Sequence, residues 1–189
     1  MPVSRWSKRT DPVQGDRYDA RGVQLARSGE NIHGEADFVD SYGPHSVLDA
    51  GCGTGRVAIE LDRRDIDVVG VDLDETMLET ARSKAPDLNW VSGDLTTIEL
   101  DQTFDVAVLA GNVMIFVLPG SEKAVLRNVA SHLEPHGVLV AGFQLGSDGI
   151  GLVAVSYTHL RAHETREDRV CRRVGGKKKG GGGGGGGGG

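Results

Sequence analysis

The chain has 189 residues, of which 38% are hydrophobic and 25% are charged, a composition that suits a soluble globular protein of one domain with extensions. The net charge of −6 hides a split, because residues 155–189 carry eight Lys/Arg and three Asp/Glu, which leaves −11 over residues 1–154. An acidic body argues against a nucleic-acid partner, and the lack of a long apolar run or a secretory signal argues against a membrane partner and favours a cytoplasmic protein.

Short apolar runs alternate with amphipathic segments through the middle of the chain. Residues 1–16 are polar and are interpreted as a flexible lead-in. Residue spacing and start and stop signals predict helices over 17–28, 34–42, 56–64, 75–84 and 121–133, with Asp74 and Ser121 as N-caps. Buried strands are predicted over 46–50, 67–72, 89–92, 104–110 and 138–143, with a turn at Pro135-His136-Gly137.

This alternation of strand and helix over residues 46–143 predicts the fold class. Continuously apolar strands indicate a parallel sheet that is covered on both faces by helices. Right-handed crossovers then give a doubly wound, three-layer α/β/α domain, which we place at residues 17–154.

A glycine-rich loop follows the first predicted strand. Gly51, Gly53 and Gly55 stand at alternate positions, where they allow a sharp turn and close approach of a ligand. The loop leads into a helix N-terminus, whose free N–H groups favour an anion. An adenosine-containing ligand is therefore expected at the carboxyl edge of the sheet, although the glycine spacing disfavours a dinucleotide.

The pattern Asp49-x-Gly51-x-Gly53-x-Gly55 resembles motif I of the class I S-adenosylmethionine-dependent methyltransferases. The resemblance covers residues 17–146 and implies a Rossmann-like methyltransferase fold with S-adenosylmethionine as cofactor. Domains of that family have seven strands, the last one antiparallel, and this sequence supplies five. We therefore expect the C-terminal strands to be missing and the sheet to have an uncovered edge.

The resemblance also implies a set of cofactor-binding residues. Asp72, 17 positions after Gly55, would accept both ribose hydroxyls, and Asp94 would meet the adenine amino group while Leu95 packs on the ring. The segment Ala110–Asn112 would hold the methionine part. The full set is Asp49, Ala50, Gly51, Cys52, Gly53, Gly55, Asp72, Leu73, Gly93, Asp94, Leu95, Ala110, Gly111 and Asn112.

Structural roles compete with these assignments. Asp49 could cap loop N–H groups, Asp94 could be a turn residue, and Cys52 is interpreted as a small loop filler rather than a nucleophile. Arg56 could meet a ligand carboxylate or lie on a solvated face, and Tyr18 could cover the cofactor. No histidine has the spacing of a metal ligand, since Pro135 interrupts any helix between His132 and His136.

The family implies methyl transfer by in-line displacement, in which the protein supplies proximity and a water-poor site. The stretch Ser28–Ala36 resembles a subgroup that acts on small molecules, so the expected partner is a small-molecule acceptor. No base constellation is evident, and Asn112 would only orient. Catalytic residues, acceptor and oligomeric state stay open. The alternatives are a non-catalytic module that binds S-adenosylmethionine for regulation, and an NAD-dependent oxidoreductase.

The C-terminal residues 155–189 break every preceding pattern and end in ten glycines. The stretch VSYTHLRAHET at 155–165 is similar, at all eleven positions, to the translation of a transposase-type sequencing adaptor. This resemblance implies a non-native, disordered tail and a native sequence that departs near residue 154. His159, His163 and Cys171 are then not functional residues. A natural basic tail with a glycine linker is the alternative.

Overall fold

The computed structural model describes residues 31–144, 150–156 and 171–173. The predicted lead-in at 1–16, the predicted helix at 17–28 and Tyr18 lie outside the described residues. Most of the predicted tail lies outside them as well.

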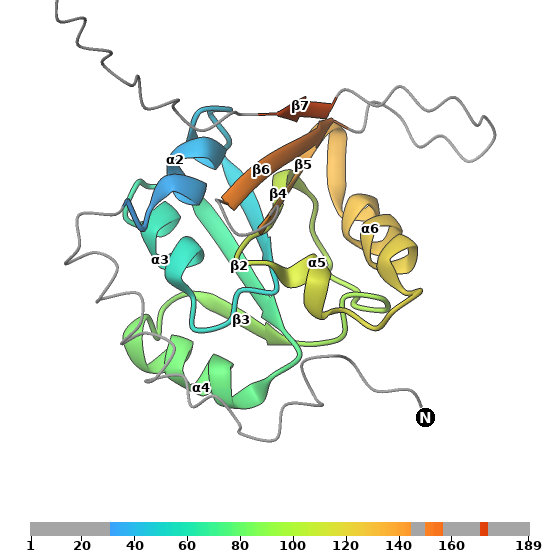
Figure 1. The fold of residues 1–189 in the computed structure, drawn as a ribbon. Coiled ribbons are helices and arrows are strands. Elements are labelled where there is room, and N and C mark those ends of the chain that lie inside the picture. The colour runs from blue at the N-terminus through green and yellow to red at the C-terminus, as the bar shows by residue number, and fades with distance from the viewer. Residues whose placement is uncertain (1–30, 145–149, 157–170, 174–189) are drawn as a thin grey trace, which may run out of the picture.

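The described segments form a seven-stranded sheet in the order β3-β2-β1-β4-β5-β6-β7 (Figure 1). Strands β1 to β5 pair in parallel, whereas β6 and β7 pair antiparallel. The strands are β1 Ser46–Ala50, β2 Asp67–Asp72, β3 Asn89–Ser92, β4 Phe104–Leu109, β5 Leu133–Gln144, β6 Ile150–Ser156 and β7 Cys171–Arg173.

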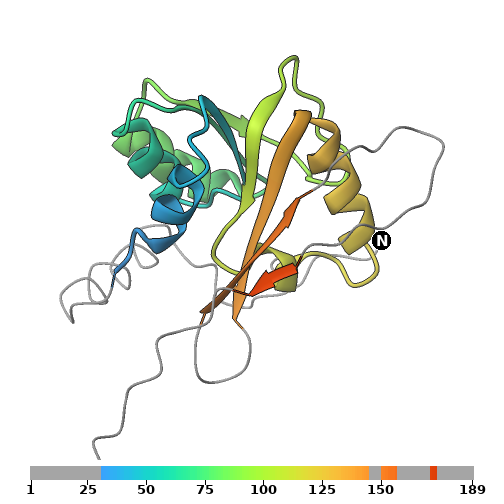
Figure 2. The same cartoon turned by 90° about the horizontal axis from the view of Figure 1, so that it is seen from above.

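Helices cover both faces of this sheet, as Figure 2 shows. On one face lie α2 (Gly34–Asp40), α3 (Arg56–Asp62) and α4 (Glu75–Lys84), and on the other lie α6 (Glu122–Ser131) and the short α5 (Val113–Phe116). The predicted three-layer α/β/α fold is confirmed. Within the described part of the chain, no helix has the length and apolar character needed to cross a bilayer.

The core is divided by the sheet into two apolar clusters. Successive side chains of a strand point to opposite faces. Val47 therefore joins the cluster under α2, α3 and α4, while Leu48 joins the cluster under α6. This two-sided burial explains why the central strands read as continuous apolar runs rather than alternating ones.

The fifth predicted strand starts earlier than its sequence indicates. We expected a turn at Pro135-His136-Gly137, but these residues lie inside β5, which begins at Leu133. His136 has a left-handed φ of 76°, and the pairing with β4 shifts register between Phe104 and Val106. The turn residues thus make a local irregularity in a strand whose main-chain groups still pair with β4.

The sheet also continues beyond the five expected strands. Strand β6 pairs antiparallel with β5 from Val138↔Ser156 to Gln144↔Ile150, so the edge expected to be uncovered is paired. Residues 150–155 read Ile-Gly-Leu-Val-Ala-Val, an apolar run with the composition of a strand. An unpaired β5 would expose a row of N–H and C=O groups, which this hairpin satisfies.

The predicted helix starts differ in their chemistry. The Asp74 carboxylate accepts from the Thr76 N–H at 3.0 Å, which confirms it as the N-cap of α4. Ser121 occupies the N-cap position of α6 but makes no such bond. Its hydroxyl instead donates to the Leu118 carbonyl at 2.7 Å, which stabilises the turn before the helix.

Trp90 of β3 packs where two glycines leave room for it. A Cβ on Gly70 would lie 2.4 Å from Trp90 Cζ3, and a Cβ on Gly55 would lie 2.5 Å from Trp90 Cη2. The indole Nε1–H donates to the Ala85 carbonyl at 2.8 Å, which fixes the ring. The start of α3 is therefore held against the sheet through this indole.

Asp49 of β1 lies beneath the first turn of α3 and is only 1% exposed. Its Oδ2 accepts from the Ala58 N–H at 3.1 Å, and its Oδ1 has no hydrogen-bond partner among the described residues. Burial raises the pKa of the Asp49 carboxyl from 3.8 to about 7, against the opposing effect of the Arg56 guanidinium.

The packing of Trp90 predicts that Gly70→Ala destabilises the fold. The added methyl must displace a fixed indole, so the free energy of unfolding should fall by about 1–3 kcal/mol in urea titrations. Gly34→Ala is the matched control, because its nearest neighbour would lie 3.9 Å away at the start of a helix. Equal losses in both variants would contradict this account.

The burial of Asp49 predicts a pH dependence of stability. Between pH 4 and 7 the folded carboxyl holds a proton that the unfolded one has lost, so stability falls as pH rises through this window. Asp49→Asn should therefore be more stable than the parent at pH 8 by about 1–3 kcal/mol, and the gap should close toward pH 4. Asp67→Asn is the control, because it also removes one carboxylate but at an exposed position.

Candidate functional site

The carboxyl ends of β1, β2, β3 and β4 meet at one edge of the sheet. The chain order runs outward from β1 to β3 on one side and from β4 to β5 on the other. The order of the strands thus reverses between β1 and β4, the place where doubly wound sheets bind ligands. All the predicted cofactor-binding residues follow or end these strands, so the fold brings them to the same edge.

The glycine-rich loop is held by the end of β2. The Val71 carbonyl accepts from the N–H groups of Gly51, at 2.7 Å, and Cys52, at 3.0 Å. The Asp72 carboxylate accepts from the Gly53 N–H at 2.7 Å. The loop conformation is therefore set by a neighbouring strand before any ligand binds.

The three loop glycines have left-handed φ angles of 85°, 55° and 82°, which confirms the predicted sharp turn. Two of them also make room for protein side chains. A Cβ on Gly51 would lie 2.5 Å from Val113 Cγ2, and Gly55 faces Trp90. Gly53 is more open, with Met77 Cε 3.6 Å from its Cβ position. Close packing against protein side chains thus requires glycine at two of these three positions.

Asp72 lies at the point where loop and strand meet. Its Oδ2 accepts from Gly53 and its Oδ1 accepts from the Asp74 N–H at 2.9 Å. Burial raises the pKa of the Asp72 carboxyl, while these N–H groups oppose the shift. Each carboxylate oxygen has two lone pairs, so both oxygens retain capacity for a further donor such as a hydroxyl.

Two leucines and an aspartate line the same edge next to Asp72. Leu73 is 53% exposed, an unusual position for a leucine that follows a buried strand, whereas Leu95 is 9% exposed. Asp94 is exposed, and its Oδ1 accepts from the Thr96 N–H at 2.8 Å and from the Thr96 hydroxyl. The turn role weighed for Asp94 is thus present, and it engages one of the two carboxylate oxygens.

Glu35 of α2 contacts the segment that follows β4. Its Oε1 accepts from the Gly111 N–H at 3.1 Å, and its Oε2 pairs with Arg56, whose guanidinium also donates to the Ile32 carbonyl. Asn112 has a left-handed φ of 70° and starts α5. Arg56 therefore pairs with a carboxylate of the protein itself, and its predicted contact with a ligand carboxylate stays a prediction.

Glu35 is the residue that sequence reasoning missed. It lies in the stretch that resembles a small-molecule subgroup, but nothing in its spacing relates it to Gly111, 76 positions later. Arg64 of the α3–β2 turn bonds Asp37 and Asp40 at 2.7 and 3.1 Å, which fastens α2 to the sheet side of the site. Together with the burial of Ala36 and Val39, these ion pairs place α2 so that Glu35 reaches the carboxyl edge.

Thiol and metal chemistry find no support in the described residues. Burial raises the pKa of the Cys52 thiol, so it stays protonated, in keeping with a loop filler. No group of three or more His, Cys, Asp or Glu side chains is placed to hold a metal ion within residues 31–144, 150–156 and 171–173.

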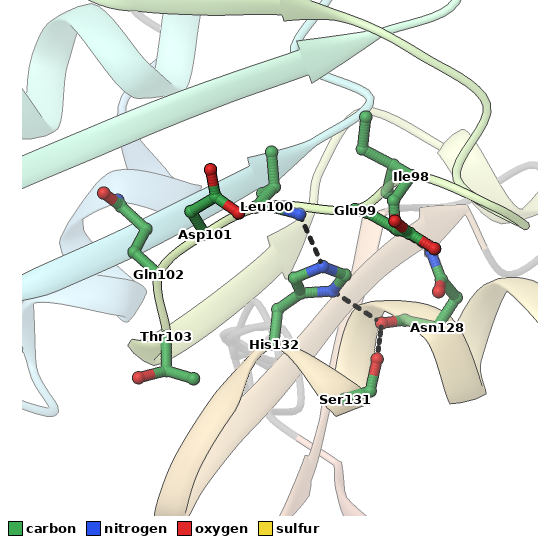
Figure 3. Close-up of a pocket in the computed structure, with 9 residues that line it drawn as sticks. All are labelled: Ile98, Glu99, Leu100, Asp101, Gln102, Thr103, Asn128, Ser131 and His132. Atoms are coloured by element: carbon green, nitrogen blue, oxygen red, sulfur yellow. Dashed lines mark hydrogen bonds between the residues drawn. The ribbon is translucent and has the colours of Figure 1, made fainter.

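A polar hollow of about 580 Å³ lies away from this edge, between α6 and the loop that precedes β4 (Figure 3). Because it is lined by residues just before the starts of β4 and β5, it belongs to the amino end of the parallel sheet. The predicted cofactor-binding residues do not line it. Its lining residues are Ile98, Glu99, Leu100, Asp101, Gln102, Thr103, Asn128, Ser131 and His132.

Comparison with known proteins gives the same family from three directions. Residues 47–137 match the family model described as a methyltransferase domain. The cypemycin N-terminal methyltransferase of a Streptomyces species is 36% identical over 106 residues, 53% of this chain and 43% of that protein. A dTDP-3-amino-3,4,6-trideoxy-alpha-D-glucopyranose N,N-dimethyltransferase of Streptomyces venezuelae is 33% identical over 126 residues, 65% of this chain and 52% of that protein. The chain thus spans about half the length of these relatives.

Solved structures extend the likeness to the fold. A TehB-like SAM-dependent methyltransferase from Corynebacterium glutamicum superposes with a TM-score of 0.65 and 37% identity, covering 72% of this chain and 76% of that one. A SAM-bound amino pentose methyltransferase from Micromonospora echinaspora shares the fold, with a TM-score of 0.57 and 24% identity over 80% and 72% of the two chains. The chain therefore belongs to the class I S-adenosylmethionine-dependent methyltransferases.

Proposed function

We propose that this protein transfers a methyl group from S-adenosylmethionine to a small-molecule acceptor. The observation that carries the proposal is the placement of Asp72, whose carboxylate fixes the glycine-rich loop and keeps lone pairs at the carboxyl edge. The exposed Leu73 beside it offers an apolar surface that an adenine ring would cover. The names of the relatives support a small acceptor, since an amino sugar and a peptide terminus are among their substrates.

The residues present fit this cofactor. We assign the ribose hydroxyls to Asp72, the adenine faces to Leu73 and Leu95, and the adenine amino group to the Oδ2 atom of Asp94. The methionine part would lie along Gly51 and the segment Ala110–Asn112, near Arg56 and the Gly111 N–H. The remaining predicted residues, Asp49, Ala50, Cys52, Gly53, Gly55 and Gly93, would shape the cradle. When bound, the sulfonium supplies an activated methyl group and a good leaving group.

The chain's own contribution to the reaction is placement rather than proton transfer. Displacement at a methyl group requires the acceptor to approach in line with the bond that breaks, so alignment and exclusion of water dominate. Asn112, held in a left-handed conformation by its N–H bond to the Gly142 carbonyl at 3.2 Å, would orient the acceptor. A base would be needed only for an acceptor that must lose its proton in the transition state.

Ligand titration tests the cofactor. We expect the full chain to bind S-adenosylmethionine and S-adenosylhomocysteine in isothermal titration calorimetry, and to show no heat with NAD at the same concentrations. Binding of NAD alone would contradict the proposal. A radiolabelled-methyl screen with small amines, chosen because one relative is an N,N-dimethyltransferase by name, then separates an enzyme from a regulatory module.

Substitution of Asp72 tests the ribose contact. Asp72→Ala should weaken binding of S-adenosylhomocysteine by roughly tenfold to a hundredfold, the value of a hydrogen bond to a charged group. Asp67→Ala is the control, because this exposed aspartate lies at the other end of the same strand. An unchanged dissociation constant for Asp72→Ala, measured by calorimetry, would remove Asp72 from the site.

The direct contact can be separated from the role of Asp72 in holding the loop. The 2′-deoxy analogue of S-adenosylhomocysteine should bind the parent more weakly than the natural ligand. In Asp72→Ala this penalty should largely disappear, because the partner of the hydroxyl is already gone. A penalty of equal size in both proteins would show that Asp72 only holds the loop and does not contact the hydroxyl.

We also propose a cytoplasmic location for the protein.

A further inference from the structure

The loop that joins β3 to β4, residues 93–103, carries the adenine-side residues Asp94 and Leu95. It is anchored at its start by the Gly93 N–H, which donates to the Asp72 carbonyl at 2.9 Å. It has no regular secondary structure that would fix the rest of it. Its position therefore depends on what it contacts on the α6 side of the sheet.

Asn128 of α6 supplies one such contact. Its side-chain amide Nδ2 donates to two main-chain carbonyls of the loop, those of Leu95 at 3.2 Å and Ile98 at 2.9 Å. A primary amide has two N–H groups, so one side chain satisfies both acceptors. This pair of bonds holds the backbone on the C-terminal side of Asp94, at the residue assigned to the adenine ring.

His132, one turn later, supplies a second contact. Its Nε2 accepts from the Leu100 N–H at 3.1 Å, and its Nδ1 lies 2.8 Å from the Asn128 carbonyl. A carbonyl only accepts, so Nδ1 carries the hydrogen and Nε2 carries the lone pair. Figure 3 shows the imidazole between the loop and the helix, making both bonds. The ring is 7% exposed, so few water molecules could replace these partners.

We propose that Asn128 and His132 are positioning residues for the cofactor, which hold the 93–103 loop so that Asp94 and Leu95 meet the adenine. Neither side chain lies among the residues of the cofactor cradle. They act through three loop main-chain groups, the carbonyls of Leu95 and Ile98 and the N–H of Leu100. The inference rests on the proposed function, because it presumes adenine at this edge. It adds a second layer of residues, on the opposite face of the sheet from α3 and α4.

The loop packing supports a direct mechanical link to the site. A Cβ on Gly93 would lie 2.4 Å from Ile98 Cδ1, so Ile98 packs against the backbone just before Asp94. Ile98 is also the residue whose carbonyl Asn128 holds and whose N–H donates to the Asp94 carbonyl at 2.8 Å. A shift of the Asn128 amide therefore displaces Asp94 through one hydrogen bond, from the Ile98 N–H, and one packing contact, between Ile98 and Gly93.

The test compares side chains that keep or lose the acceptor at residue 132. His132→Phe preserves a ring but removes both bonds, whereas His132→Gln can still accept from the Leu100 N–H. We expect the dissociation constant of S-adenosylhomocysteine to rise about tenfold in His132→Phe and to stay within about twofold in His132→Gln. Arg127→Gln, at an exposed position of the same helix, is the control and should bind like the parent.

A purely structural role would lower the melting temperature without moving ligand selectivity. The second probe is therefore S-inosylhomocysteine, which lacks the adenine amino group. The parent should prefer S-adenosylhomocysteine by about tenfold, and His132→Phe should lose most of this preference at a temperature where it is folded. Should His132→Phe not fold, Asn128→Ser carries the same comparison, because its shorter side chain cannot reach the loop carbonyls.

The outcomes separate the two proposals. A parent that binds neither probe would overturn the proposed function and this inference together. A parent that binds and discriminates, with folded His132→Phe or Asn128→Ser proteins that bind and discriminate equally well, would overturn the positioning role alone. The positioning role would be established if His132→Phe binds S-adenosylhomocysteine more weakly and loses the preference for the adenine amino group, while His132→Gln keeps both properties.

Discussion

The main-chain carbonyl of Val71 and the carboxylate of Asp72 determine where the glycine-rich loop lies. Together they accept three successive loop N–H groups, those of Gly51, Cys52 and Gly53. Parallel pairing of β1 with β2 brings these acceptors to the loop. The geometry of the loop therefore depends on the register in which these two strands pair. The rest of the edge, from Leu73 to the end of β4, is arranged around this junction.

The two faces of the sheet contribute differently to the site. Beneath the loop, Trp90 fills the space left by Gly55 and Gly70, so α3 approaches β1 closely and Asp49 is enclosed. On the other face, α6 holds an irregular loop by side-chain bonds to main-chain groups. The first arrangement relies on tight apolar packing and the second on hydrogen bonds, which explains why a rigid turn and a long loop can serve the same ligand edge.

Local sequence patterns predicted the central strands and the helices between them, because continuous apolar runs and N-caps such as Asp74 act over a few residues. The same patterns predicted that Asp49, Asp72 and Asp94 lie at or just after the ends of strands. They did not predict the extra pairing of β6, the placement of Pro135 to Gly137 inside β5, or the role of Glu35. Those features depend on partners far along the chain, which local spacing does not encode.

Helix α2 precedes residue 47, where the match to the family model begins, yet its Glu35 bonds both Arg56 and Gly111. A segment outside the shared core thus carries a carboxylate into it. Suppose that such N-terminal segments are exchanged between relatives to change the methyl acceptor. Each transplanted segment must then supply a carboxylate that pairs with the arginine at the position of Arg56. Hybrids that lack this ion pair would then fail to fold or to bind the cofactor, even when the shared cores of the two relatives are very similar.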